Sequence, residues 1–173
     1  MNDDNVLIGF YLNGKPDSQG RTLLSYLDGG NDWWEECHQH MQWAFPLPEP
    51  SRMQPTAPVA GDNFHDAIKG SPLGRAMMLA QLGRYIQFLA QTQQWRQARD
   101  HNHLRITRVI RCLTLCGLIE AARSFRAYAV SVVGGIVPAE TLTFWHTATN
   151  KYPSWVPSYT ERVLAMVAAR REN

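Results

Sequence analysis

The sequence predicts an all-α fold, a single globular domain of six or seven helices with a proline-rich extended segment at 46–58. Three observations predict this fold. Apolar residues recur at intervals of three and four over most of the chain, as in helices that bury one face. Glycine, proline and capping residues bound segments of helical length. The 173 residues, of which 45% are hydrophobic, suit one folded domain, and no internal repeat divides residues 1–173.

The first predicted elements are short. Residues 6–12 are apolar and end at a turn dipeptide of asparagine and glycine, so we expect an extended segment there. A short helix is expected over 21–27, before a pair of glycines. The next helix is expected to run unbroken over 33–45, with Asp32 as its cap. Its core-facing stripe consists of Trp33, Trp34, Cys37, Met41, Ala44 and Phe45.

The middle of the chain changes character at its prolines. Five prolines between 46 and 58 exclude a helix, because proline fixes φ and lacks an N–H donor. We expect this segment to wrap the surface of the domain. Ser71 is expected to cap a long helix that ends near residue 93, and Asn102 to cap a helix that Gly117 terminates. Further helices are expected over 62–69, 118–133, 138–150 and 157–171.

Charge is unevenly distributed, although the net charge is only +2. Residues 1–50 contain eight acidic and two basic residues, whereas 51–173 contain seven acidic and fifteen basic ones. We expect these two parts to neutralise each other across the fold. No apolar run is long enough to span a membrane, and the acidic N-terminus lacks the positive start of a secretory signal. The odd number of cysteines indicates reduced thiols and a cytoplasmic location.

Two segments carry a family resemblance. Residues 42–51, QWAFPLPEPS, are similar to a "QW-x-FP-x-x-E" signature, and residues 101–110, HNHLRITRVI, are similar to an "HN-x-LRITR" signature. Both signatures belong to the conserved domain of the opioid growth factor receptor family, whose microbial members are short stand-alone proteins. The chain resembles this domain from about Phe10 to Trp145.

The resemblance implies a receptor-like function. Animal members of the family are described as receptors for an enkephalin peptide, and no catalytic residue is assigned to the domain. The first hypothesis is therefore a non-catalytic module without a cofactor, which binds a peptide or protein of unknown identity. An opioid ligand is not carried over to a chain of microbial type, and the sequence indicates no oligomeric state.

The candidate ligand-binding residues cluster at the second signature. Arg105 borders the apolar stripe of its predicted helix, whereas Arg108 and Arg111 are expected to point away. A desolvated arginine needs an anionic partner, and Glu49 of the first signature is the expected one. Alternatively, a small anion or an enzyme substrate binds at the helix start, where free N–H groups favour anions. The candidate residues are His101, Asn102, His103, Arg105 and Arg108, with Trp43 and Glu49 beside them.

Trp43 falls on the polar face of its predicted helix. We expect it either to stack on the prolines that follow or to remain exposed and dock a peptide. A third functional hypothesis is weak nucleic-acid binding through an arginine-rich face, although no recognised motif supports it. Its residues are Arg96, Arg99, Arg105, Arg108, Arg111, Arg123 and Arg126.

No metal site is expected. His38 and His40 are two residues apart on a predicted helix and point about 200° from each other, so they cannot bind one ion together. Cys112 and Cys116 share an apolar helical face, where cysteine behaves as a small hydrophobic residue. Catalysis by Cys37 is not expected, because nothing in the sequence indicates an activated thiol.

Overall fold

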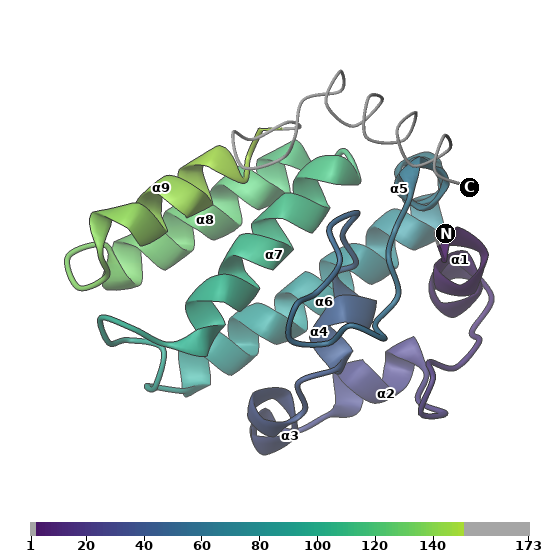
Figure 1. The fold of residues 1–173 in the computed structure, drawn as a ribbon, viewed down its shortest axis with the longest axis horizontal. Coiled ribbons are helices and arrows are strands. Elements are labelled where there is room, and N and C mark those ends of the chain that lie inside the picture. The colour runs from purple at the N-terminus through teal and green to yellow at the C-terminus, as the bar shows by residue number, and fades with distance from the viewer. Residues whose placement is uncertain (1–2, 151–173) are drawn as a thin grey trace, which may run out of the picture.

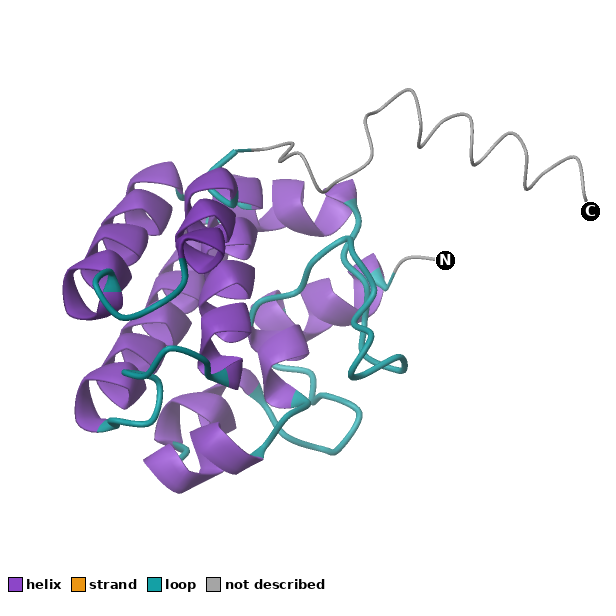
Figure 2. Cartoon of the chain, turned by 60° about the vertical axis from the view of Figure 1, so that its left-hand side comes forward, coloured by secondary structure: helices purple, strands orange, loops and turns teal. Residues whose placement is uncertain are grey.

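Helices account for all the regular secondary structure of residues 3–150, the part of the chain that this computed structural model describes. Figure 2 shows them joined by loops, without a strand in that range. The predicted all-α class is confirmed. The nine helices of this range are α1 (Asp4–Leu12), α2 (Leu23–Asp28), α3 (Asn31–Glu36), α4 (His40–Ala44), α5 (Asp62–Gly70), α6 (Pro72–Gln91), α7 (His101–Leu115), α8 (Ile119–Val133) and α9 (Ala139–Thr147).

The first difference from the predicted elements is α1, which is helical where an extended segment was expected. Leu7, Phe10 and Tyr11 are buried, and their intervals of three and four place them on one helical face. The carboxylate of Asp3 accepts a hydrogen bond from the backbone N–H of Val59 at 2.9 Å. The start of the helix is therefore tied to the loop before α5.

The second difference is a break between α3 and α4, where one helix over 33–45 was expected. The Arg105 guanidinium donates hydrogen bonds to the carbonyl oxygens of Trp34 (2.9 Å) and Glu35 (3.0 Å). In a continuous helix, these carbonyls would accept bonds from N–H groups four residues further on. The side chain of Arg105, which is distant in sequence, thus supplies the hydrogen-bond donors at the C-terminal end of α3. The cap of α3 is Gly30 and not the predicted Asp32.

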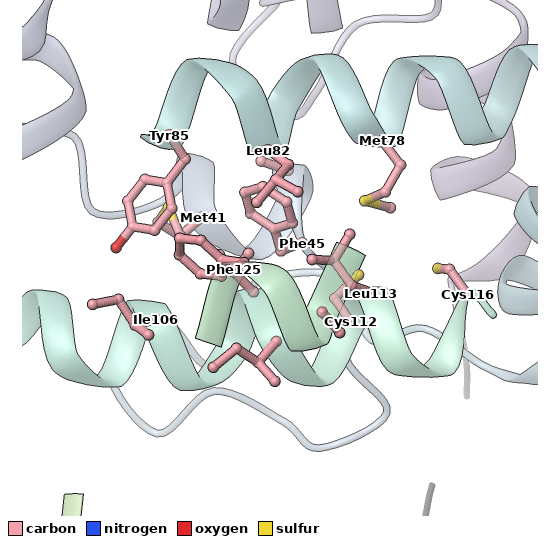
Figure 3. Packing of buried hydrophobic residues seen from close by; sticks show 14 of the residues in the cluster. Met41, Phe45, Met78, Leu82, Tyr85, Ile106, Cys112, Leu113, Cys116 and Phe125 are labelled. Atoms are coloured by element: carbon pink, nitrogen blue, oxygen red, sulfur yellow. The ribbon is translucent and has the colours of Figure 1, made fainter. Parts of the chain in front are cut away.

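The long helix α6 starts as predicted and lines the centre of the core. The Ser71 hydroxyl accepts a hydrogen bond from the backbone N–H of Gly74 at 3.0 Å, and proline occupies the first helical position. Figure 3 shows Met78, Leu82 and Tyr85 pointing from this helix toward the apolar side chains of α7. All three are buried.

The helix of the second signature, α7, begins and ends at defined caps. Its N-cap is Asp100, whose carboxylate accepts a hydrogen bond from the backbone N–H of Asn102 at 2.8 Å. Asn102 is thus inside the helix and does not cap it. At the other end, Gly117 has a φ of +73°, and the N–H of Leu118 donates to the Leu113 carbonyl at 2.8 Å. Glycine terminates this helix as predicted.

The remaining elements complete one domain. Helices α8 and α9 pack against α7 (Figure 1). A single apolar core runs from Leu7 to Ala148. Between α4 and α5 the proline-rich segment forms an irregular loop. Among the described helices none is long and apolar enough to cross a membrane. The helix expected over 157–171 lies outside the described residues.

Candidate functional site

The two signature segments lie side by side in the structure. The Arg108 guanidinium donates a hydrogen bond to the Phe45 carbonyl at 3.1 Å. Further along α7, Arg111 forms an ion pair with Glu49 at 3.0 Å. The loop after α4 is thereby fixed along one side of α7 (Figure 1). The helix that carries the second signature and the loop that carries the first thus lie next to each other and together line one surface.

A groove of about 500 Å³ lies between this helix and this loop. Its walls come from residues 38–54 and from the side of α7 between His101 and Arg111. This stretch of helix is about 15 Å long, at 1.5 Å per residue. The apolar part of the lining consists of Met41, Leu47, Pro50, Met53 and Leu104.

Two large apolar side chains of the groove face solvent. Leu104 is 73% exposed and Met53 is 82% exposed, which are the two highest values among the exposed large hydrophobic residues of the described chain. They lie on opposite walls, Leu104 on α7 and Met53 on the loop. Apolar surface that is gathered in a concave site marks a binding surface more than single exposed residues do.

The loop wall is held by a buried amide. With the Gln42 amide oriented so that its NH₂ group faces carbonyls, it donates to His38 (2.9 Å) and Gln39 (3.1 Å). The amide oxygen then accepts a hydrogen bond from the Ser51 hydroxyl at 3.3 Å. Ser51 also accepts a hydrogen bond from the backbone N–H of Gln54 at 3.1 Å. The first signature thus shapes the groove wall as well as lining it.

Arg105 is buried as predicted, but Glu49 is not its partner. Besides the two α3 carbonyls, its guanidinium contacts the Asn102 side-chain oxygen (3.1 Å) and His38 Nδ1 (3.2 Å). The nearest carboxylate is that of Glu35, at 3.9 Å. The sequence did not point to Glu35 because the helix that contains it was expected to continue past it. In a continuous helix, the backbone carbonyls near Glu35 would be bonded within the helix and could not accept hydrogen bonds from Arg105.

Glu49 pairs instead with Arg111, which was expected to point away from the core. The Arg111 side chain is only 3% exposed. It also donates to the carbonyl of Asn150 at 3.3 Å. Both the first signature loop and the chain after α9 therefore cover this part of α7. A helical wheel of α7 alone cannot show that its polar side is covered.

Arg108 lines the groove and differs from the other two arginines of this helix. Its hydrogen bond to the Phe45 carbonyl is a contact with a neutral group. No carboxylate of the described residues lies within ion-pair distance of it. Burial lowers the pKa of the Arg108 guanidinium below its ordinary value. The groove thus contains a partly desolvated cation on which the Glu49 charge acts only from beyond ion-pair distance, with no closer carboxylate in the described part of the chain.

The three residues at the start of α7 have separate roles. His101 lines the groove, and its Nε2 lies 3.3 Å from a Glu35 carboxylate oxygen. Asn102 is buried and donates to Glu35 at 3.1 Å. His103 is buried, and its Nε2 pairs with the Trp95 carbonyl at 2.8 Å. Of these three candidates, only His101 lines the groove.

The start of α7 also carries carboxylates of its own. Asp100 caps the first turn, and Glu35 contacts two side chains of that turn. Asp100 accepts from a backbone N–H at the helix N-terminus, and Glu35 places a second negative charge beside it, so an external anion would be repelled there. The geometry therefore favours the groove over the helix start as a place for a ligand.

Trp43 does not lie on a polar face, and that prediction was wrong. It is 5% exposed, and its ring meets Phe10 edge to face at a centroid distance of 5.3 Å. The reason is the break before α4, which changes the direction in which this residue points. Trp43 does not line the groove, so it is part of the core and not of the candidate site.

The remaining histidines and cysteines form no cluster of three metal ligands among residues 3–150. His40 is buried among aromatic rings, whereas His38 is exposed. Cys112 and Cys116 are buried in the core as predicted. Cys37 accepts a hydrogen bond from Arg21 at 3.0 Å.

The arginines of the third hypothesis do not form one free face. Arg105 and Arg111 are buried and paired with groups of the protein. Trp95, the tryptophan nearest to them in sequence, is fully buried, and its Nε1 donates to the Leu89 carbonyl at 2.7 Å. Stacking on a base requires an exposed ring. The structure therefore gives little support to a nucleic-acid surface here.

Fold and site together define an all-helical protein with an open apolar groove that contains arginines. Comparison with protein-family models, curated proteins and solved structures finds no match for this chain. The family resemblance therefore stays a prediction from its two signature segments.

Proposed function

We propose that this chain is a non-catalytic, receptor-like module of the opioid growth factor receptor type, which binds a peptide or protein partner in the cytoplasm. The groove between residues 38–54 and α7 is its binding site. The observation that carries the proposal is the pair of exposed apolar side chains, Leu104 and Met53, on opposite walls of that groove. Such surface is costly to leave in water and is covered favourably by an apolar partner.

The construction of the groove supports the same function. Both signature segments are used to build it, the first as a loop wall and the second as a helix wall. A helix beside a shaped loop presents a ready groove for a short amphipathic segment. The groove volume is also within the range of sites that bind small ligands or a few side chains.

A displayed library of random peptides of about 10 residues, a length that spans the three helical turns of the groove, tests the proposal. We expect the full-length protein to enrich peptides that share apolar residues. Leu104→Ser should weaken the enriched peptides at least about tenfold, because the lost contact lies at the rim of the groove.

The matched control is Leu24→Ser, since Leu24 is 61% exposed on α2, away from the groove. It should leave peptide binding unchanged. Thermal unfolding of both variants should stay close to that of the parent protein, as both side chains are mostly in water. An equal loss of binding in the two variants, or no enrichment by the parent protein, would refute the groove as a peptide site.

A further inference from the structure

The charge of the groove specifies its ligand further. Four arginines and one glutamate line it, which gives the lining a formal charge of +3 with histidines neutral: Arg52, Arg105, Arg108, Arg111 and Glu49. The charges of Arg105 and Arg111 are satisfied within the protein by the contacts given above. The local excess of positive charge is therefore carried by Arg108 on the helix wall and Arg52 on the loop wall.

We propose that the groove binds a partner segment that carries an acidic side chain, aspartate or glutamate, between apolar residues, and that Arg108 pairs with this carboxylate. This inference rests on the proposed function, since it specifies the peptide that the groove takes. The carboxylate supplies the anionic partner that Arg108 lacks among the described residues. A charge-assisted pair in a partly dehydrated groove is stronger than one at the open surface.

The position of Arg108 favours a side chain over a chain end. The groove follows α7 from His101 to Arg111, and Arg108 lies between these limits, one turn beyond Leu104. Residues four apart on a helix share a face, so Leu104 and Arg108 form adjacent apolar and cationic contact points. A segment laid along the helix would place an internal residue at Arg108. Arg52, exposed on the opposite wall, is placed to attract the same charge.

The test uses pairs of synthetic peptides made from the sequences that the library enriches. The two members of a pair differ only by Glu→Gln at one position flanked by apolar residues, and both ends are blocked to remove terminal charges. Fluorescence anisotropy with the full-length protein measures their affinities. We expect the glutamate member to bind at least about tenfold more tightly, with a preference that added salt reduces.

Variants of Arg108 and Arg52 test whether the preference for the glutamate peptide arises in the groove. Arg108→Gln retains a donor for the Phe45 carbonyl and should bind both members of a pair with nearly equal affinity. Arg52→Glu changes an exposed side chain, so it tests the charge of the groove without altering the core. It should reverse the preference toward a peptide with lysine at the same position. The matched control is Arg123→Gln on α8, which should keep the preference of the parent protein.

The outcomes distinguish the proposal of an acidic ligand from the proposed peptide-binding function. Equal affinity of the parent protein for the glutamate and glutamine members would overturn the acidic ligand and leave peptide binding standing. Binding only of peptides with a free C-terminal carboxylate would overturn the internal acidic side chain. An unchanged preference in both Arg108→Gln and Arg52→Glu would also overturn it. Failure of every peptide to bind would refute the proposed function, and this inference with it.

Discussion

At the scale of single residues, Arg105 shows how one side chain determines a helix boundary. Its guanidinium donates hydrogen bonds to the Trp34 and Glu35 carbonyls. Helix α3 therefore ends there, although the apolar pattern of the sequence predicts a longer helix. Only 8% of the residue is exposed, and two of its partner groups belong to the buried residues Trp34 and Asn102. Loss of this side chain would leave those groups without a partner.

Arg105→Ala should therefore lower the free energy of unfolding by more than ~2 kcal/mol. Urea denaturation followed by circular dichroism measures this difference. Arg123→Ala is the matched control, because its side chain is 61% exposed and, among the described residues, pairs only with Glu120 on the same helix. The control should change stability by no more than ~0.5 kcal/mol. A similarly small effect for Arg105→Ala would contradict a structural role for this residue.

His40 makes stability depend on pH. Burial, together with the nearby Arg105 charge, lowers its pKa from an ordinary value of 6.5 to about 3. Its Nδ1 bonds to the Cys37 carbonyl, while no group in the described part of the chain pairs with Nε2. The unfolded chain takes up a proton below pH 6.5 and the folded protein does not. The stability from the neutral ring is thus complete above pH 6.5 and is lost as the pH falls toward 3.

Unfolding free energies of the parent protein should fall between pH 6.5 and 5 by up to ~1.4 kcal/mol per pH unit from this group. His40→Asn, which keeps a donor for the Cys37 carbonyl, should show a shallower slope over the same range. A residual slope is expected from His65, whose pKa is also lowered by burial. Identical slopes for the parent and His40→Asn would rule out His40 as the source.

At the scale of elements, glycine decides where α7 ends. Gly117 adopts a left-handed conformation, and a Cβ there would lie 3.2 Å from the Lys69 side chain. Its N–H donates to the Thr114 carbonyl at 3.1 Å, which together with the bond from Leu118 to Leu113 completes a Schellman cap. The turn that brings α8 back onto α7 depends on this conformation.

Gly117→Ala should cost ~1–2 kcal/mol of stability because an L-residue is strained at positive φ. Gly83→Ala offers a control of opposite sign. Gly83 lies exposed within α6, and nothing is within 4 Å of an added Cβ. Alanine there should stabilise the protein by ~0.5–1 kcal/mol. Equal effects of the two substitutions in thermal and urea denaturation would contradict the assigned end of α7.

Most helices were predicted from local sequence signals. The predictions that were wrong depend on contacts between residues far apart in the sequence. The caps at Ser71 and Gly117 depend on neighbouring residues, and both were predicted correctly. The break before α4 depends on Arg105, which is about 70 residues away in sequence. The buried state of Arg111 depends on the loop that covers it. A helical wheel describes one helix and contains no information on which other segment packs against it.

At the scale of the whole molecule, the charge split has an internal role. Among residues 3–150, two arginine–carboxylate pairs join the acidic first part to the basic remainder, Arg105 with Glu35 and Arg111 with Glu49. Asp17 instead pairs locally, accepting from Arg21 at 2.7 Å and from Tyr26 at 2.6 Å. Neutralisation across the fold is thus confirmed for part of the acidic segment. Of the three arginines on α7, Arg108 has no carboxylate of the described residues within ion-pair distance, and it lies in the groove.

The groove was only partly predictable from the sequence. His101, Arg105, Arg108 and Glu49 were among the expected site residues and line it. Leu104 was missed, although its position outside the apolar stripe of α7 was a usable signal. Met53 gave no such signal, because the direction of a side chain in a loop does not follow from periodicity.

Hydrogen–deuterium exchange of the full-length protein, with and without a library-selected peptide, tests the central claim most directly. Binding in the groove predicts added protection in residues 45–54 and in the groove side of α7, with little change in α8 and α9. The Leu104→Ser variant should lose that protection at the same peptide concentration. Protection confined to α8 and α9, or retained in full by Leu104→Ser, would place the binding site elsewhere and contradict the account.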